Sequence, residues 1–179
     1  LPICGGYAIS SWVEKLSYES AAAIIAVSDG MRNDVLNAYP NVDSRKVHTI
    51  RNGINTEKFA PSHDSATLKK YGISGPYALF VGRITRQKGL AHLLRAWKQV
   101  SPEFSLVLAA GSPDEPAIGA EVEQLIAELS AIRGNIYWLK EMLPHAALIS
   151  LLTHAKTFLC PSIYEPLGIV NLDRKSTRL

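Results

Sequence analysis

Apolar and polar positions follow two repeating patterns along the chain. Short apolar runs rich in Val, Ile, Leu and Ala predict buried β-strands at 23–27, 47–50, 77–81, 105–110, 136–139 and 157–160. Longer stretches with apolar residues on one face predict helices near 7–19, 29–39, 90–100, 117–132 and 146–154. Strands that alternate with helices in this way are typical of a parallel sheet covered by helices on both faces. The sequence therefore predicts an α/β fold.

The segment 55–76 interrupts this alternation. It is polar, contains several Pro, Ser and Gly residues, and has one short helical stretch at 66–71. Such a composition is typical of a connector between structural units. We therefore expect one unit over 1–54 and another over 77–172, each shorter than a complete doubly wound domain.

Composition and charge limit the classes of function. Of 179 residues, 47% are apolar and 20% are charged, which predicts a packed core. A net charge of +3 without a basic run gives no indication of a nucleic-acid partner. No apolar stretch approaches the roughly 20 residues of a membrane span, so no membrane partner is expected. Cys4 and Cys160 are too far apart for a metal knuckle or a redox pair, and we interpret them as reduced, buried thiols of a cytoplasmic protein.

The first chemical cluster follows the strand predicted at 77–81. A turn with Gly82, Arg83, Lys88 and Gly89 leads directly into the next helix. In open α/β sheets, ligands bind beyond the carboxyl ends of strands, and helix N-termini attract anions. The glycines allow the backbone to approach a ligand closely, and the cations can neutralise phosphate oxygens. We predict a phosphate or diphosphate site here, with a solvated cationic turn as the alternative.

The second cluster follows the strand predicted at 157–160. Glu165 precedes a proline, which disfavours helical backbone and places its carboxylate on a rigid corner. The carboxylate can accept hydrogen bonds from sugar hydroxyls, and the backbone N–H groups of Gly168, Ile169 and Val170 can face phosphate where a new helix starts. The alternative is a glutamate that only caps or solubilises a turn. Two complementary clusters at successive strand ends weaken that alternative.

The two clusters contain Gly82-Arg83-x-x-x-x-Lys88-Gly89 and, at 161–170, Pro-Ser-x-Tyr-Glu-Pro-x-Gly-Ile-Val. Together they resemble the donor-binding half of retaining glycosyltransferases of the GT-B type. The stretches 6–12, 82–89 and 161–172 resemble most closely the actinobacterial form of glycogen synthase, also described as α-maltose-1-phosphate synthase. The resemblance implies two Rossmann-like lobes with parallel sheets, both incomplete in this sequence. Residues 1–54 would end the acceptor lobe and form the hinge, and 77–172 would begin the donor lobe.

The resemblance also implies roles for individual residues. Arg83 and Lys88 would hold the donor diphosphate without a metal ion or another cofactor, and Glu165 would contact the hydroxyls of the transferred sugar. These three residues form the predicted catalytic set. The remaining predicted contacts with the donor are Gly82, Gly111, Lys140, Met142, Gly168, Ile169 and Val170.

The reaction implied by the resemblance is the transfer of glucose, with retention, in glycogen synthesis. The donor would be a nucleoside diphosphate sugar such as ADP-glucose, and the acceptor maltose 1-phosphate or an α-1,4-glucan. Three alternatives stay open. One is a related transferase with another donor or acceptor, such as a mannosyltransferase that acts on a lipid. The others are a GT-B epimerase and a nucleotide-sugar-binding module without catalytic activity.

The sequence departs from the family pattern at both ends. The family has a second glutamate eight positions after the first, where this chain has Asp173. The Arg-Lys-Ser-Thr-Arg-Leu that follows resembles a translated sequencing-library adapter, so we hypothesise that 173–179 is not native. In the family, an acceptor lobe would precede Leu1 and further donor-lobe helices would follow Leu172. We therefore expect the chain alone to be unstable and inactive as a transferase.

Overall fold

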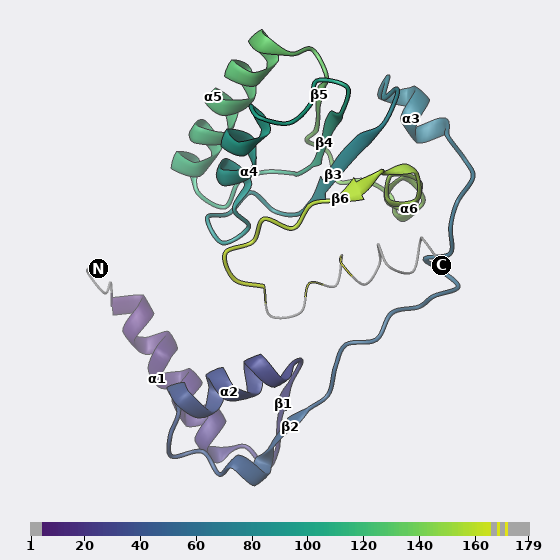
Figure 1. The fold of residues 1–179 in the computed structure, drawn as a ribbon. Coiled ribbons are helices and arrows are strands. Elements are labelled where there is room, and N and C mark those ends of the chain that lie inside the picture. Colours follow the sequence, from purple (N-terminus) through teal and green to yellow (C-terminus); the bar gives the residue numbers. More distant parts are fainter. Residues whose placement is uncertain (1–4, 166–167, 169–170, 172–179) are drawn as a thin grey trace. The chain divides into compact units, whose positions relative to one another are not determined.

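The computed structural model describes residues 5–165, 168 and 171. The chain divides between Gly53 and Ile54 into two compact units (Figure 1). Each unit contains a parallel sheet, with two strands in the first and four in the second. The predicted α/β fold with parallel sheets is confirmed.

The first unit is built around strands β1 (Ile24–Ala26) and β2 (Val47–Thr49), which pair in parallel. Its helices are α1 (Gly5–Ser20) and α2 (Asp29–Ala38), and a short 3₁₀ helix, Ser44–Lys46, precedes β2. The expected strands and helices are therefore present, with ends that differ by one or two residues. The buried core of this unit comprises Ile24, Ala26, Val35, Val42 and Val47.

Strand β1 differs from the prediction in one respect. The sequence predicts a strand buried on both faces, but only Ile24 and Ala26 are buried, and Ile25 between them is exposed. Successive side chains of a strand point to opposite faces. The described core of this unit therefore covers one face of its two-stranded sheet.

The second unit contains the four-stranded sheet, in the order β5-β4-β3-β6, with all strands parallel (Figure 1). Its elements in chain order are α3 (Ala66–Lys70), β3 (Tyr77–Val81), α4 (Leu90–Trp97), β4 (Ser105–Ala109), α5 (Pro116–Ile132), β5 (Ile136–Leu139), α6 (His145–His154) and β6 (Thr157–Phe158). Strand β3 therefore lies between β4 and β6. The chain proceeds from β3 through β4 to β5 and then returns to the other side of β3.

Alternate residues of β3 pack into two separate cores. Ala78 and Phe80 belong to a core formed with α4 and α5, whereas Tyr77 and Leu79 belong to a core formed with α3 and α6. This division follows from the two-residue period of a strand. The prediction that helices cover both faces of the sheet is confirmed for this unit.

Helix α4 ends at Trp97, three residues before the predicted end at residue 100. The guanidinium of Arg133 donates hydrogen bonds to the carbonyls of Trp97 and Val100 at 2.9 and 3.0 Å, and to those of Ser101 and Phe104 at 2.9 and 3.2 Å. The Trp97 carbonyl is one of the helix-end acceptors without an intrahelical partner, and the other three carbonyls lie in the turns that follow the helix. Arg133, more than 30 residues later, thus satisfies the end of the helix.

Strand β6 is also shorter than predicted. It pairs with β3 only at Thr157 and Phe158, and the chain then leaves the sheet. Cys160, predicted to be buried, is exposed as a result. Cys4 lies outside the described residues. In the described part of the chain, no helix has the length and apolar character needed to cross a membrane.

Candidate functional site

Two loops begin at the carboxyl ends of neighbouring strands. We name residues 82–89, which follow β3, the phosphate loop, and residues 161–165, which follow β6, the sugar loop, after the contacts predicted for them from the sequence. Strands β3 and β6 are parallel and paired, so both loops leave the same edge of the sheet. The order of the strands reverses between β3 and β6, and such a switch point is where open α/β sheets bind ligands.

Backbone contacts hold the phosphate loop against the sugar loop. The N–H of Ile163 donates to the carbonyl of Gln87 at 2.9 Å, and the side-chain Nε2 of Gln87 donates to the carbonyl of Tyr164 at 2.8 Å. Gly89 has a φ of +65°, and a Cβ added there would lie 2.1 Å from the carbonyl oxygen of Pro161. Only glycine therefore allows the two backbones to approach this closely.

The side chains of Lys88 and Glu165 meet between the two loops. Lys88 Nζ lies 2.5 Å from Glu165 Oε2, and the hydroxyl of Ser162 donates to the same oxygen at 3.0 Å. The two charged side chains are only 25% and 20% exposed. The structure thus brings together two of the three residues predicted to be catalytic. Ser162 belongs to the Pro-Ser-x-Tyr-Glu motif, but its role as a donor to Glu165 could not be seen without the fold.

The environment of Glu165 favours its charged form. Burial raises the pKa of this carboxyl group, but the hydrogen bonds from Lys88 and Ser162, the charge of Lys88 and a backbone hydrogen bond from Gly168 together outweigh burial. The net effect is a pKa below the ordinary value of a glutamate. Glu165 is therefore an ionised hydrogen-bond acceptor at neutral pH.

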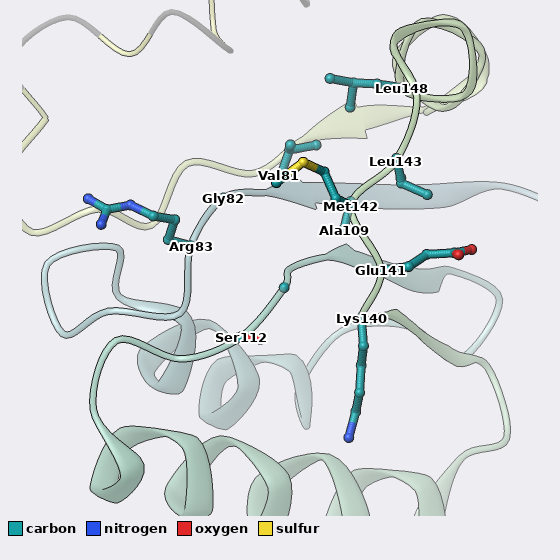
Figure 2. Close-up of a pocket in the computed structure, with 11 residues that line it drawn as sticks. Val81, Gly82, Arg83, Ala109, Ser112, Lys140, Glu141, Met142, Leu143 and Leu148 are labelled. Carbon is teal, nitrogen blue, oxygen red and sulfur yellow. The ribbon is translucent and has the colours of Figure 1, made fainter.

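Arg83, the third residue predicted to be catalytic, does not join this pair. Its guanidinium forms an ion pair with Asp114 at 3.0 Å, and its side chain is 71% exposed. Figure 2 shows the Arg83 side chain extending away from the other labelled residues, which line a pocket described below. Asp114 comes from the loop after β4, and its N–H also donates to the carbonyl of Ile84 at 3.2 Å. The loop that carries Arg83 is thus tied to the loop after β4.

A pocket of about 520 Å³ lies beside the phosphate loop, at the ends of β3 and β4 (Figure 2). We name it the nucleotide pocket, after the donor contacts predicted from the sequence for four of the residues that line it. Four of the predicted donor contacts line it, and they are Gly82, Gly111, Lys140 and Met142. Much of the remaining wall comes from apolar side chains of the two strands, of α6 and of the segment just before α6, and they are Val81, Ala109, Leu143 and Leu148. Arg83, Ser112 and Glu141 complete the lining.

The side chain of Lys140 is directed away from the nucleotide pocket (Figure 2). Its Nζ pairs with Glu123 at 3.2 Å and lies 4.0 Å from the centre of the Trp138 ring. The backbone of Lys140 approaches Gly111, where an added Cβ would lie 3.7 Å from the Lys140 carbonyl oxygen. Lys140 therefore contributes main chain rather than its charge to this wall.

The neighbouring residues of this wall differ in how firmly they are held. Met142 is 97% exposed at the mouth of the nucleotide pocket. Glu141, in contrast, accepts hydrogen bonds from the hydroxyl of Tyr71 and, at 3.1 Å, from Lys70. The connector helix α3 thus holds the segment between β5 and α6, a link that could not be predicted from the sequence.

Gly168 lies next to Glu165, with a φ of +67°. A Cβ added there would lie 3.1 Å from Glu165 Cγ and 2.3 Å from the side-chain nitrogen of Asn171. Ile169 and Val170, the last two predicted donor contacts, lie outside the described residues, as does the 173–179 tail. Within the described residues, no three His, Cys, Asp or Glu side chains are grouped so that they could hold a metal ion.

Comparisons with known proteins agree with this arrangement. The family described as "Glycosyl transferases group 1" matches residues 66–177, and "Glycosyltransferase Family 4" matches residues 5–58. Alpha-maltose-1-phosphate synthase of Mycolicibacterium smegmatis is 48% identical over 174 residues, which cover 94% of this chain and 45% of that protein. The synthase of the same name from Mycobacterium tuberculosis is 46% identical, with the same coverage. The chain thus spans less than half the length of these curated relatives.

Solved structures give the same result for the fold. Anabaena HepE in complex with UDP and glucose has a TM-score of 0.81 at 19% identity, and the match covers 94% of this chain and 46% of that one. Sucrose-phosphate synthase from Thermosynechococcus elongatus has a TM-score of 0.76 at 25% identity, with coverage of 95% and 42%. These structural neighbours are GT-B glycosyltransferases. Because the group 1 match takes in most of the chain, including the whole phosphate loop and sugar loop, the chain belongs to the family of group 1 glycosyl transferases.

Proposed function

We propose that this sequence is part of a cytoplasmic retaining glucosyltransferase that takes glucose from ADP-glucose. The observation that carries the proposal is the pair formed by Lys88 and Glu165 at the ends of β3 and β6. A nucleotide-sugar presents complementary groups next to each other, because its hydroxyl-rich sugar is bonded directly to its diphosphate. On this proposal, residues 77–172 belong to the donor lobe, and residues 1–54 end the acceptor lobe.

Each part of the site has a chemical role in this proposal. The nucleotide pocket, with its apolar walls, receives the nucleoside. Lys88 stabilises the negative charge that develops on the departing diphosphate, and Glu165 accepts a hydrogen bond from a hydroxyl of the glucose. Arg83 reaches the diphosphate after it leaves Asp114. An exposed ion pair of this kind contributes at most about 1 kcal/mol, so a diphosphate with two negative charges can replace it.

The name of the two mycobacterial relatives supports the proposal for the acceptor. They are named for maltose 1-phosphate, which contains two glucose units and one phosphate. Transfer of one glucose unit gives that product only if the acceptor is glucose 1-phosphate. We therefore propose glucose 1-phosphate, rather than maltose 1-phosphate, as the first acceptor to test, with an α-1,4-glucan as the second. The reaction joins an acceptor hydroxyl oxygen to the anomeric carbon and releases ADP and a proton.

The test uses the full-length protein that carries this sequence. ADP release is followed with ADP-glucose and each acceptor, and the new linkage is assigned by NMR. Lys88→Ala is expected to lower kcat by about 10²-fold or more, in the range found when one transition-state hydrogen-bond donor is removed. Lys98→Ala is the matched control, because Lys98 pairs with Glu128 on the exposed side of α4 and α5 and should leave kcat unchanged. An unchanged kcat in Lys88→Ala would show that Lys88 does not stabilise the departing diphosphate.

The same assay separates the alternatives. Faster turnover with GDP-mannose or UDP-glucose than with ADP-glucose would change the donor but keep the site. Release of an altered sugar without any acceptor would indicate an epimerase. Binding of ADP-glucose without turnover, in the presence of both acceptors, would indicate a nucleotide-sugar-binding module.

A further inference from the structure

The sugar loop has little apolar burial of its own. Ile163 and Tyr164 are both among the exposed large apolar side chains, and Ser162 and Glu165 are polar. Buried apolar area, which positions most of the second unit, therefore contributes little to the placement of this loop. Its position depends instead on polar contacts with the phosphate loop.

Gln87 provides two of those contacts, through two different groups. Its carbonyl accepts from the N–H of Ile163 at 2.9 Å, and its side-chain Nε2 donates to the carbonyl of Tyr164 at 2.8 Å. Both distances are those of well-formed hydrogen bonds. The two contacts involve the two residues immediately before Glu165, so they determine where the backbone of Glu165 begins.

The carboxylate of Glu165 is then oriented from its other end. Lys88, the residue after Gln87, lies 2.5 Å from Glu165 Oε2, and Ser162 donates to the same oxygen at 3.0 Å. A carboxylate has about four acceptor sites, and with the backbone of Gly168 three donors engage this one. The carboxylate can therefore accept one more hydrogen bond, from a hydroxyl of the sugar. The direction in which this acceptor site points depends on where the backbone of Glu165 lies.

We propose that Gln87 is a positioning residue for the donor sugar, because its amide holds the backbone of the sugar loop so that Glu165 faces the sugar hydroxyls. This inference rests on the proposed function. Gln87 does not line the nucleotide pocket. Loss of its amide should therefore weaken recognition of the sugar and leave recognition of the nucleoside diphosphate intact.

The test compares ADP-glucose with ADP by isothermal titration calorimetry on the full-length protein. Gln87→Met keeps the length of the side chain but removes the donor. Gln87→Asn keeps the amide but is one methylene too short to reach the Tyr164 carbonyl. Both variants should bind ADP-glucose about tenfold more weakly, as expected for the loss of one well-placed hydrogen bond, and ADP within about twofold of the unmodified protein. The kcat with saturating donor should fall in both.

Gln99→Met is the matched control, because Gln99 lies in the turn after α4 and its side chain is exposed. This variant should change neither affinity. If the Gln87 variants bind ADP and ADP-glucose equally more weakly, Gln87 has a general structural role and the proposal is overturned. Affinities equal to those of the unmodified protein would also overturn the proposal. If the unmodified protein binds ADP but shows no preference for ADP-glucose and no turnover, the proposed function fails instead.

Discussion

Gly89→Ala tests whether the close approach of the two loops is required. Gly89 has a φ of +65°, and an alanine Cβ would lie 2.1 Å from the carbonyl oxygen of Pro161. A left-handed backbone costs an alanine about 1–2 kcal/mol. The contact adds a second cost, because the two backbones must separate by more than about 1 Å before the Cβ reaches an ordinary van der Waals distance. Overpacking of this kind costs about 1–3 kcal/mol.

Gly72→Ala separates these two costs. Gly72 has a φ of +64°, but an added Cβ there would meet nothing within 4 Å. This variant should therefore lower the free energy of unfolding by the backbone cost alone, about 1–2 kcal/mol. Gly89→Ala should exceed it by about 1–3 kcal/mol in urea unfolding of the full-length protein.

A local measurement shows where the extra cost arises. The N–H of Ile163 donates to the carbonyl of Gln87, two residues before Gly89. Separation of the loops in Gly89→Ala should break this hydrogen bond and speed the hydrogen exchange of a peptide that covers 161–165, whereas Gly72→Ala should not. Equal unfolding free energies for the two variants, with no change in exchange at the sugar loop, would refute the reasoning.

Three further predictions concern stability. Arg133→Lys should lower the free energy of unfolding by about 1–3 kcal/mol, measured in urea, because an ammonium group cannot reproduce the guanidinium contacts at the end of α4. Tyr77→Phe should cost about 1 kcal/mol in the same assay, because the buried hydroxyl donates to the carbonyl of Leu151 at 2.7 Å. The folded state lowers the pKa of Glu165 below about 4.5, so the stability from this group is present above that pH and is lost as the pH falls through the folded pKa. Lys88→Met should raise that folded pKa and remove part of this acid dependence, which urea unfolding between pH 3 and pH 7 would measure.

The fold could be predicted from the sequence because it follows from local periodicity. The strand at 77–81 is apolar at every position, and the helix that begins at Leu90 has an apolar face that becomes buried. The element ends were harder to predict where a distant residue determines them. Arg133 donates to the carbonyl of Trp97, the last residue of helix α4, and no pattern within the helix contains that information.

The site could be predicted only in part, for a related physical reason. Charged residues at strand ends stand out in a sequence, so Lys88 and Glu165 could be identified, although not their direct contact. Gln87 and Ser162 are neutral polar residues of a kind that is common in loops. Gln87 meets the sugar loop only after β3 and β6 have paired, and Ser162 contacts Glu165 through the local conformation of that loop. Arg83 could be identified as a cation, but its pairing with Asp114 depends on the loop after β4.

The order of the strands explains why the two clusters form one site. Lys88 and Glu165 are 77 positions apart, and β4 and β5 lie between them in the chain. After β5, helix α6 carries the chain to the other side of β3, so that β6 becomes the neighbour of β3. Helix α4 packs on one face of the sheet and α6 on the other. The loops that follow β3 and β6 therefore start side by side at the carboxyl-end edge of the sheet, where open α/β sheets bind their ligands. A chain that placed β6 beside β5 would contain the same motifs but would separate Lys88 from Glu165 by the width of β4 and β5.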